Sequence, residues 1–150
     1  MKVNDWEPKS DAEKVVHALI GGWTDLASQR AALEAYLAPD VEWWNGGWPT
    51  IHGRDTAVML LDMFAAMIEM TESRIEVKHV ASNGNVVFTE RVDRLYRADG
   101  SLISEPPIVG IFEVADGQVQ RWREYEDPRH LFPGGKYPEG LEEMVSGMLG

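Results

Sequence analysis

Residues 89–96 have the sequence Thr89-Glu90-Arg91-Val92-Asp93-Arg94-Leu95-Tyr96 and continue the strand-forming run Val86-Val87-Phe88. Alternate side chains of a β-strand point to the same face. Arg91 and Asp93 therefore share a face with the apolar Val87 and Leu95. A guanidinium and a carboxylate on such a face must be paired or take part in chemistry, because burying an isolated charge is costly.

A second charge at an apolar position is predicted in the strand-like run Trp122-Arg123-Glu124-Tyr125-Glu126-Asp127. There Glu124 shares a face with Trp122. If both strands line one pocket, they hold an array of two carboxyl groups around one arginine. The alternative is a structural cross-strand ion pair, since sheet faces often carry opposite charges. Glu90 and Arg94 already supply a solvent face, which favours the array.

The order of predicted elements indicates an α+β domain spanning residues 1–150. Ser10 and Glu13 have the spacing of a capping box before a first helix. A second helix is expected at about residues 28–37, closed by Ala38-Pro39-Asp40, and a third from a cap at Asp55 to about Met70. A methionine stripe on this third helix is interpreted as core: Met59, Met63, Met67 and Met70. Residues 1–9 and about 132–150 are expected to be peripheral tails, with a short helix from Glu139.

Strands are predicted at residues 41–45, 74–80, 85–97, 102–114 and 119–126, separated where Asn or Asp precedes Gly in turn-like sequences. Pro106-Pro107 interrupts the fourth of these and predicts a bulge or an exposed edge, because proline cannot donate to the ladder. Helices followed by long antiparallel strands indicate a strongly curved sheet wrapped around the helices. Such a sheet forms a cone with an apolar pocket at one end.

The composition narrows the class of protein. Without cysteine, disulfides, thiolate metal sites and a cysteine nucleophile are excluded, which fits the cytoplasm. No basic-then-apolar stretch opens the sequence, so secretion is not expected, and no apolar run approaches the roughly 20 residues of a membrane span. A net charge of -11 argues against nucleic acid, so a neutral or cationic small molecule is the easier partner. The histidines lack metal-ligand spacing and no dinucleotide fingerprint is present, so no metal or cofactor is expected.

Several motifs resemble the limonene-1,2-epoxide hydrolase family: Ser82-Asn83-Gly84, Glu90-Arg91-Val92-Asp93, Gly110-Ile111-Phe112 and Trp122-Arg123-Glu124-Tyr125, with Asn45 and Gly53-Arg54-Asp55. The resemblance extends from the first helix to about Arg129. The family's superfamily includes nuclear transport factor 2 (NTF2), scytalone dehydratase and ketosteroid isomerase. The resemblance implies an NTF2-like cone, in which a strongly curved mixed sheet wraps around three to four helices and a deep apolar pocket.

In this family an Asp–Arg–Asp triad opens an epoxide in one step to give a vicinal diol. By resemblance, Asp93 is the general acid, Arg91 bridges the carboxyl groups and Asn45 holds the attacking water. The second Asp position is Glu124 here, one methylene longer, as the general base. The position of a water-holding Tyr falls on Trp43, whose indole N–H can donate but not accept.

The resemblance also implies the partners. A small hydrophobic epoxide and water are the expected ligands, with no cofactor, nucleic acid or membrane. The pocket is expected to be lined by Trp43, Trp44, Trp48, Leu95 and Trp122. A homodimer formed through the outer sheet face is expected by analogy.

Two other functions remain open from the sequence. An isomerase or cyclase of the same superfamily would use one carboxylate to move a proton beside a carbonyl, and Glu124 would be dispensable. A non-catalytic module would hold an apolar ligand in the cone and need no protonatable array. Unchanged ligand affinity in Arg91→Ala and Asp93→Asn variants would favour that module.

Overall fold

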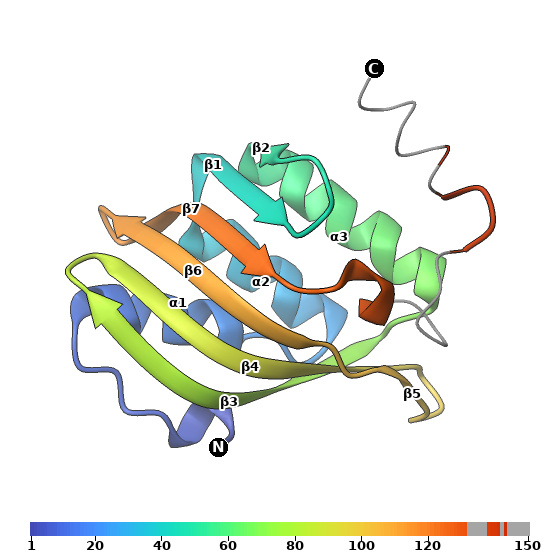
Figure 1. The fold of residues 1–150 in the computed structure, drawn as a ribbon, viewed down its shortest axis with the longest axis horizontal. Coiled ribbons are helices and arrows are strands. Elements are labelled where there is room, and N and C mark those ends of the chain that lie inside the picture. Colours follow the sequence, from blue (N-terminus) through green and yellow to red (C-terminus); the bar gives the residue numbers. More distant parts are fainter. Residues whose placement is uncertain (132–137, 142, 144–150) are drawn as a thin grey trace.

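The computed structural model describes residues 1–131, 138–141 and 143. A sheet curls around three α-helices that lie together on one of its faces (Figure 1). The helices are α1 (Asp11–Gly21), α2 (Leu26–Tyr36) and α3 (Arg54–Ile68), with short 3-10 helices η1 (Val3–Asp5) and η2 (Pro128–Leu131). The strands are β1 (Leu37–Asn45), β2 (Ile51–His52), β3 (Glu72–Asn83), β4 (Val86–Tyr96), β5 (Leu102–Ser104), β6 (Pro107–Ala115) and β7 (Gln118–Tyr125).

The strand order in the sheet is β2-β1-β7-β6-β4-β3, with β5 beside β4. Strands β1 and β7 are parallel, whereas β7, β6, β4 and β3 form an antiparallel series. The sheet is therefore mixed, as the resemblance implied. The parallel pair places the end of β1 beside the end of β7, so that Asn45 lies opposite Glu124.

The helix starts follow local capping chemistry. Ser10 accepts a hydrogen bond from the backbone N–H of Glu13 at 3.1 Å, which confirms the predicted cap of α1. Asp25 caps α2 by accepting from Ser28 N at 2.8 Å, so this helix begins earlier than predicted. The prediction of Asp55 as the cap of α3 was wrong. Gly53 (φ 93°) is the N-cap residue and Asp55 lies in the first turn.

Two proline positions shape the strands. Ala38-Pro39-Asp40 follows the end of α2 as predicted, but it already lies within β1, which begins at Leu37 rather than at Val41. The pairing of β1 with β7 shifts register between Leu37 and Glu42, which accommodates a residue that cannot donate to the ladder. Pro106 separates β5 from β6, so the interruption predicted from Pro106-Pro107 is confirmed.

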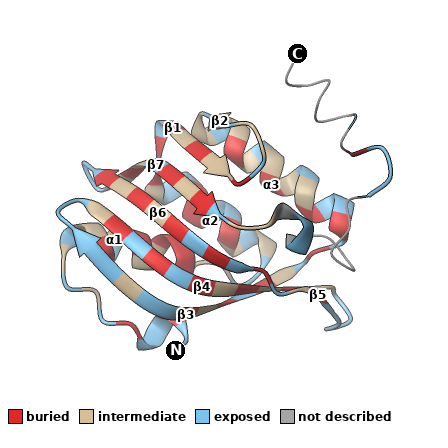
Figure 2. Ribbon diagram, viewed as in Figure 1, coloured by how far each residue is buried: buried red, intermediate tan, exposed pale blue. Residues whose placement is uncertain are grey.

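The core lies between the sheet and the helices (Figure 2). Buried and exposed residues alternate along β4 and β6, as expected for strands with one face on a core. Residues near both ends of the chain contribute side chains to the core. Val3, Trp6 and Leu141 are buried, so apolar side chains anchor segments that were expected to be peripheral. Most of residues 132–150, with the helix predicted from Glu139, lies outside the described residues.

Helix α3 buries a different stripe from the predicted methionine core. Ala57, Leu61, Ala65 and Ile68 are its buried residues, whereas Met59 is 53% exposed. The prediction of a methionine core holds for Met70, which is 5% exposed just beyond the helix, and is wrong for Met59, Met63 and Met67, because the core-facing side of the helix follows the spacing of Ala57 and Leu61. Of the described helices, none has the length and hydropathy needed to cross a membrane.

Candidate active site

Strand β4 places Arg91 and Asp93 on the core face of the sheet. Their exposed fractions are 1% and 3%, and the flanking Val87 and Leu95 are also buried. The predicted burial of two opposite charges on an apolar strand face is therefore confirmed. Glu90 and Arg94 lie on the other face, where Arg94 donates to Glu76 at 2.8 Å.

Arg91 joins the two predicted carboxyl groups. Its Nε donates to Asp93 Oδ1 at 3.0 Å and its Nη2 to Asp93 Oδ2 at 3.3 Å. The same Nη2 also donates to Glu124 Oε1, and Nη1 donates to Thr89 Oγ1 at 3.2 Å. Glu124 is 2% exposed. We refer to Arg91, Asp93 and Glu124 as the carboxylate array. The hydrogen bonds from Arg91 to two carboxyl groups fix the plane of its guanidinium group.

Gly110 of β6 provides the space for this array. It lies opposite Thr89 of β4 on one side and Glu124 of β7 on the other. A Cβ atom at this position would lie 2.5 Å from Arg91 Nη1 and 2.9 Å from Glu124 Oε2. Both distances are shorter than a van der Waals contact, so a side chain at residue 110 would force the ends of Arg91 and Glu124 to move from these positions.

The parallel β1–β7 pair brings Asn45 and Trp43 to the same site. Asn45 is opposite Glu124, and Gly46 N donates to the Glu124 carbonyl at 2.8 Å, which fixes the two chain segments together. The ring of Trp43 stacks on Trp122 with centroids 4.3 Å apart. Among the described residues, no protein acceptor is found for the buried Trp43 Nε1.

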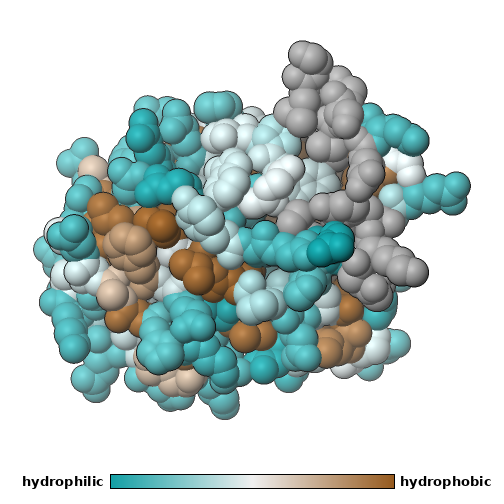
Figure 3. Space-filling model, in the orientation of Figure 1, coloured by the Kyte–Doolittle hydropathy of each residue, from teal (hydrophilic) through white to brown (hydrophobic). Residues whose placement is uncertain are grey.

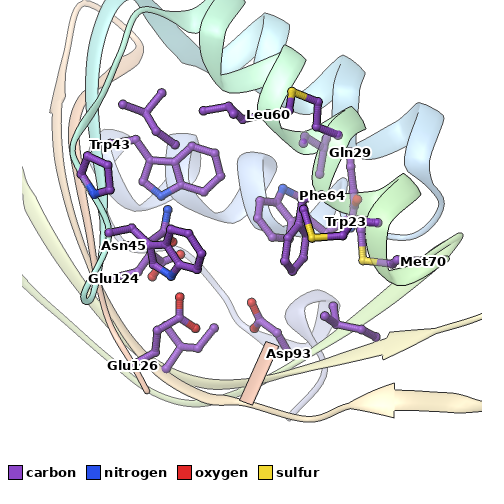
Figure 4. Close-up of a pocket in the computed structure, with 18 of the residues that line it drawn as sticks. Trp23, Gln29, Trp43, Asn45, Leu60, Phe64, Met70, Asp93, Glu124 and Glu126 are labelled. Carbon is purple, nitrogen blue, oxygen red and sulfur yellow. The ribbon is translucent and has the colours of Figure 1, made fainter. Parts of the chain in front are cut away.

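A cavity of about 250 Å³ opens beside the array (Figure 4). Its polar lining consists of Gln29, Asn45, Asp93, Glu124 and Glu126. The remaining lining residues are apolar and come mainly from α3, β1, β4 and the loop after β1: they include Trp43, Trp48, Leu60, Phe64, Met67 and Leu95. Trp43, Trp48 and Leu95 thus lie where the sequence predicted.

Two predicted lining residues do not reach the cavity as the structure describes it. Trp44 has the opposite parity to Trp43 and packs edge-on against Tyr125, with ring centroids 5.1 Å apart. Trp122 is fully buried behind Trp43 and in contact with Phe112. The prediction treated all tryptophans near the array as lining, but alternation sends Trp44 outward, and stacking places Trp122 one layer deeper.

Glu126 is a cavity residue that the sequence analysis missed. Its carboxyl group points into the cavity beside Glu124 and Asp93 (Figure 4), and its buried Oε2 has no hydrogen-bond partner among the described residues. The signal was present, because Glu126 has the same strand parity as Trp122 and Glu124. Glu126 is therefore a third carboxyl group in the cavity, beside the two that Arg91 bonds.

Burial raises the pKa of all three carboxyl groups. It raises the pKa of Glu124 to about 7 although Arg91 acts in the opposite direction, and it also raises the pKa of Asp93 against Arg91. Burial, followed by the charges of Glu124 and Asp93, raises the pKa of Glu126 to about 8. Burial alone would lower the pKa of Arg91, but Asp93 and Glu124 raise it above its usual range. The site can therefore hold a proton beside an ionised carboxylate near neutral pH.

The Glu126→Gln variant is expected to gain stability relative to the wild type as pH rises. Burial raises the pKa of Glu126 from its ordinary value of 4.5 to about 8 in the folded protein. Its contribution to stability is present at low pH and is lost as pH rises through 8, because the folded state must then bury a charge. Glutamine cannot ionise. We expect the difference in melting temperature to grow by about 2 °C or more between about pH 5 and pH 9. Exposed Glu34→Gln is the control, and an equal shift at both pH values would contradict the expectation.

Comparison with known proteins places the chain in a family. The limonene-1,2-epoxide hydrolase catalytic domain matches residues 10–135. Epoxide hydrolase EphG of Mycobacterium tuberculosis strain H37Rv is 32% identical over 103 residues, which cover 68% of this chain and 65% of that relative. A solved LEH-like epoxide hydrolase of M. tuberculosis has a TM-score of 0.65 and 24% identity, covering 93% of this chain and 95% of the other.

The fold is shared more widely. An NTF2-like protein from Anabaena variabilis has a TM-score of 0.64 at 20% identity, covering 81% of this chain and 93% of the other. A SnoaL-like protein from Jannaschia sp. CCS1 has a TM-score of 0.63 at 18% identity, covering 81% and 92%. The curled sheet around its helices is thus the NTF2-like fold. With the domain match over most of its length, the chain belongs to the limonene-1,2-epoxide hydrolase family.

Proposed function

We propose that this protein is a cofactor-independent epoxide hydrolase that adds water in one step to a small hydrophobic epoxide and releases a vicinal diol. The observation that carries the proposal is the bridging of two buried carboxyl groups by Arg91 at the wall of a largely apolar cavity. A binding cavity for apolar ligands gains nothing from burying these groups, because each carries a desolvation cost. Push–pull chemistry needs an acid and a base held in this way.

The proposed roles follow from the neighbours of each carboxyl group. Glu124 lies beside Asn45, so a water held by the Asn45 amide would be within reach of the Glu124 carboxylate. Glu124 takes a proton from this water as the water oxygen bonds to an epoxide carbon. The carbon–oxygen bond of the ring breaks, and Asp93 gives its proton to the departing oxygen. A proton then returns from Glu124 to Asp93, which restores the starting state.

The two departures from the family pattern fit this scheme. Glu124 is one methylene longer than aspartate, and its Oε2 lies over Gly110, where the neighbouring strand leaves room. Trp43 replaces the family's water-holding tyrosine and lines the cavity with an indole N–H that lacks a protein acceptor among the described residues. Trp43 can thus donate to the water or the epoxide oxygen, while Asn45 and Glu124 supply the acceptors that the indole lacks.

A panel of small epoxides incubated in oxygen-18 water tests the function. We expect diol from at least one hydrophobic epoxide, with one labelled oxygen in the diol and none in the protein carboxylates after a single turnover. Label in Asp93 or Glu124 would instead indicate a covalent ester and reject the one-step reaction. No diol from any epoxide would reject the hydrolase.

We also propose that the protein forms a homodimer through the outer face of the sheet. Apolar patches lie over this face between hydrophilic ones (Figure 3), and Phe88, Val109 and Tyr125 are exposed there. Clustered exposed apolar residues are typical of protein interfaces. Sedimentation velocity is expected to give a dimer for the wild type and a shift toward monomer for Val109→Glu. A monomeric wild type at micromolar concentration would contradict the dimer.

A further inference from the structure

Gln29 of α2 is a buried polar side chain in the cavity wall that the proposed reaction does not use. It is 1% exposed and lines the cavity. Its side-chain carbonyl oxygen, Oε1, has no hydrogen-bond partner among the described residues. A buried acceptor without a partner is unfavourable unless a ligand supplies the donor.

The orientation of the amide is fixed by its neighbours. The Ser73 hydroxyl donates to the Trp23 carbonyl oxygen at 3.4 Å. Because a hydroxyl has one hydrogen, Ser73 Oγ accepts from Gln29 Nε2 rather than donating to the amide. The amide nitrogen of Gln29 is thus directed to Ser73, which leaves Oε1 as the atom available to a ligand.

This wall is separate from the carboxylate array. Gln29 lies near Trp23 and Met70 on one side of the view, Glu124 and Glu126 lie on the other side, and Asp93 lies between the two groups (Figure 4). Trp23 also lines the cavity, and its buried Nε1 has no acceptor among the residues that the structure describes. An acceptor and a donor on one wall match a hydroxyl group, which both donates and accepts. A cationic group fits less well, because this wall offers no carboxylate.

We propose that Gln29 Oε1 accepts a hydrogen bond from a hydroxyl group that the substrate carries away from its epoxide ring. The substrate class would then be hydroxylated epoxides rather than pure hydrocarbon epoxides. That the ligand is an epoxide rests on the proposed hydrolase function. The preference for a hydroxyl group concerns binding and can be measured without catalysis.

Two ligands of equal size test the preference: cyclohexene oxides that carry, opposite the epoxide, either a hydroxymethyl or an ethyl group. Dissociation constants are measured by tryptophan fluorescence in the Asp93→Asn variant, which is expected to consume the ligands at least about a hundredfold more slowly than the wild type. We expect the hydroxymethyl ligand to bind about tenfold more tightly, since the ethyl ligand leaves the Gln29 oxygen buried and unpaired. Adding Gln29→Met, of similar volume and without an amide, should bring the ratio to about one.

The controls separate this inference from the proposed function. Met67→Leu changes the same cavity without a polar group and should shift both dissociation constants alike. Equal affinities for the two ligands, a ratio unchanged by Gln29→Met, or binding of neither ligand would overturn the inference. The comparison of ligands in the Asp93→Asn background holds even if Gln29→Met does not fold. A preference for the hydroxymethyl ligand, without diol formation by the wild-type protein, would reject the hydrolase and retain the Gln29 site. Diol formation without that preference would retain the hydrolase and reject the Gln29 site.

Discussion

Replacing Asp93 with asparagine is expected to lower kcat for diol formation by about a hundredfold to ten-thousandfold, the usual effect of a lost general acid. Asparagine has nearly the same shape and can still accept one hydrogen bond from Arg91, but it has no proton to give to the epoxide oxygen. Single-turnover rates with the best epoxide of the panel measure the loss. Ligand binding and the melting temperature, followed in parallel, distinguish lost chemistry from lost folding. A variant with the wild-type rate would show that Asp93 is not the acid.

Replacing Glu124 with glutamine is expected to cause a loss of similar size, because an amide cannot take the proton from the attacking water. Glu113→Gln is a matched control: Glu113 lies on the outer face of β6 and pairs with Arg123, so its loss should leave kcat close to that of the wild type. Full activity in Glu124→Gln would instead favour the isomerase or cyclase alternative, which uses a single carboxylate.

The pH dependence of the wild type gives a second measurement on Glu124. The base must be ionised, and burial raises the pKa of Glu124 to about 7. The rate is therefore expected to rise as pH increases through 7 and to fall again where the acid loses its proton, giving a bell-shaped profile. The rising limb should be missing from the residual activity of Glu124→Gln.

Much of the site could be predicted from strand parity. Alternation placed Arg91 and Asp93 on the apolar face of β4, and Glu124 with Trp122 on the apolar face of β7. The same rule includes Glu126 and excludes Trp44, whereas the prediction counted the tryptophans near the array as lining whatever their parity. The sequence thus identified the ionisable residues of the array, but it did not show which neighbouring side chains reach the cavity and which lie behind it.

Other features depend on long-range pairing that no local pattern encodes. The parallel alignment of β1 with β7 brings Asn45 beside Glu124, although 79 positions separate them in the chain. Gln29 belongs to the buried side of α2 with Ala32 and Leu33, so its burial could have been inferred from helical spacing. Its hydrogen bond to Ser73 could not, because that contact joins α2 to β3.

The missing side chain at position 110 makes two distant positions depend on each other. A Cβ at residue 110 would lie 2.5 Å from Arg91 Nη1 and 2.9 Å from Glu124 Oε2, so the ends of both side chains would have to shift to make room for it. Redesign of the base must therefore treat positions 110 and 124 as a pair. Among related sequences, a residue larger than glycine at position 110 is expected to occur with an acid shorter than glutamate, or with no acid, at position 124. The combination of Gly110 and Glu124 can therefore mark related chains that use glutamate as the base.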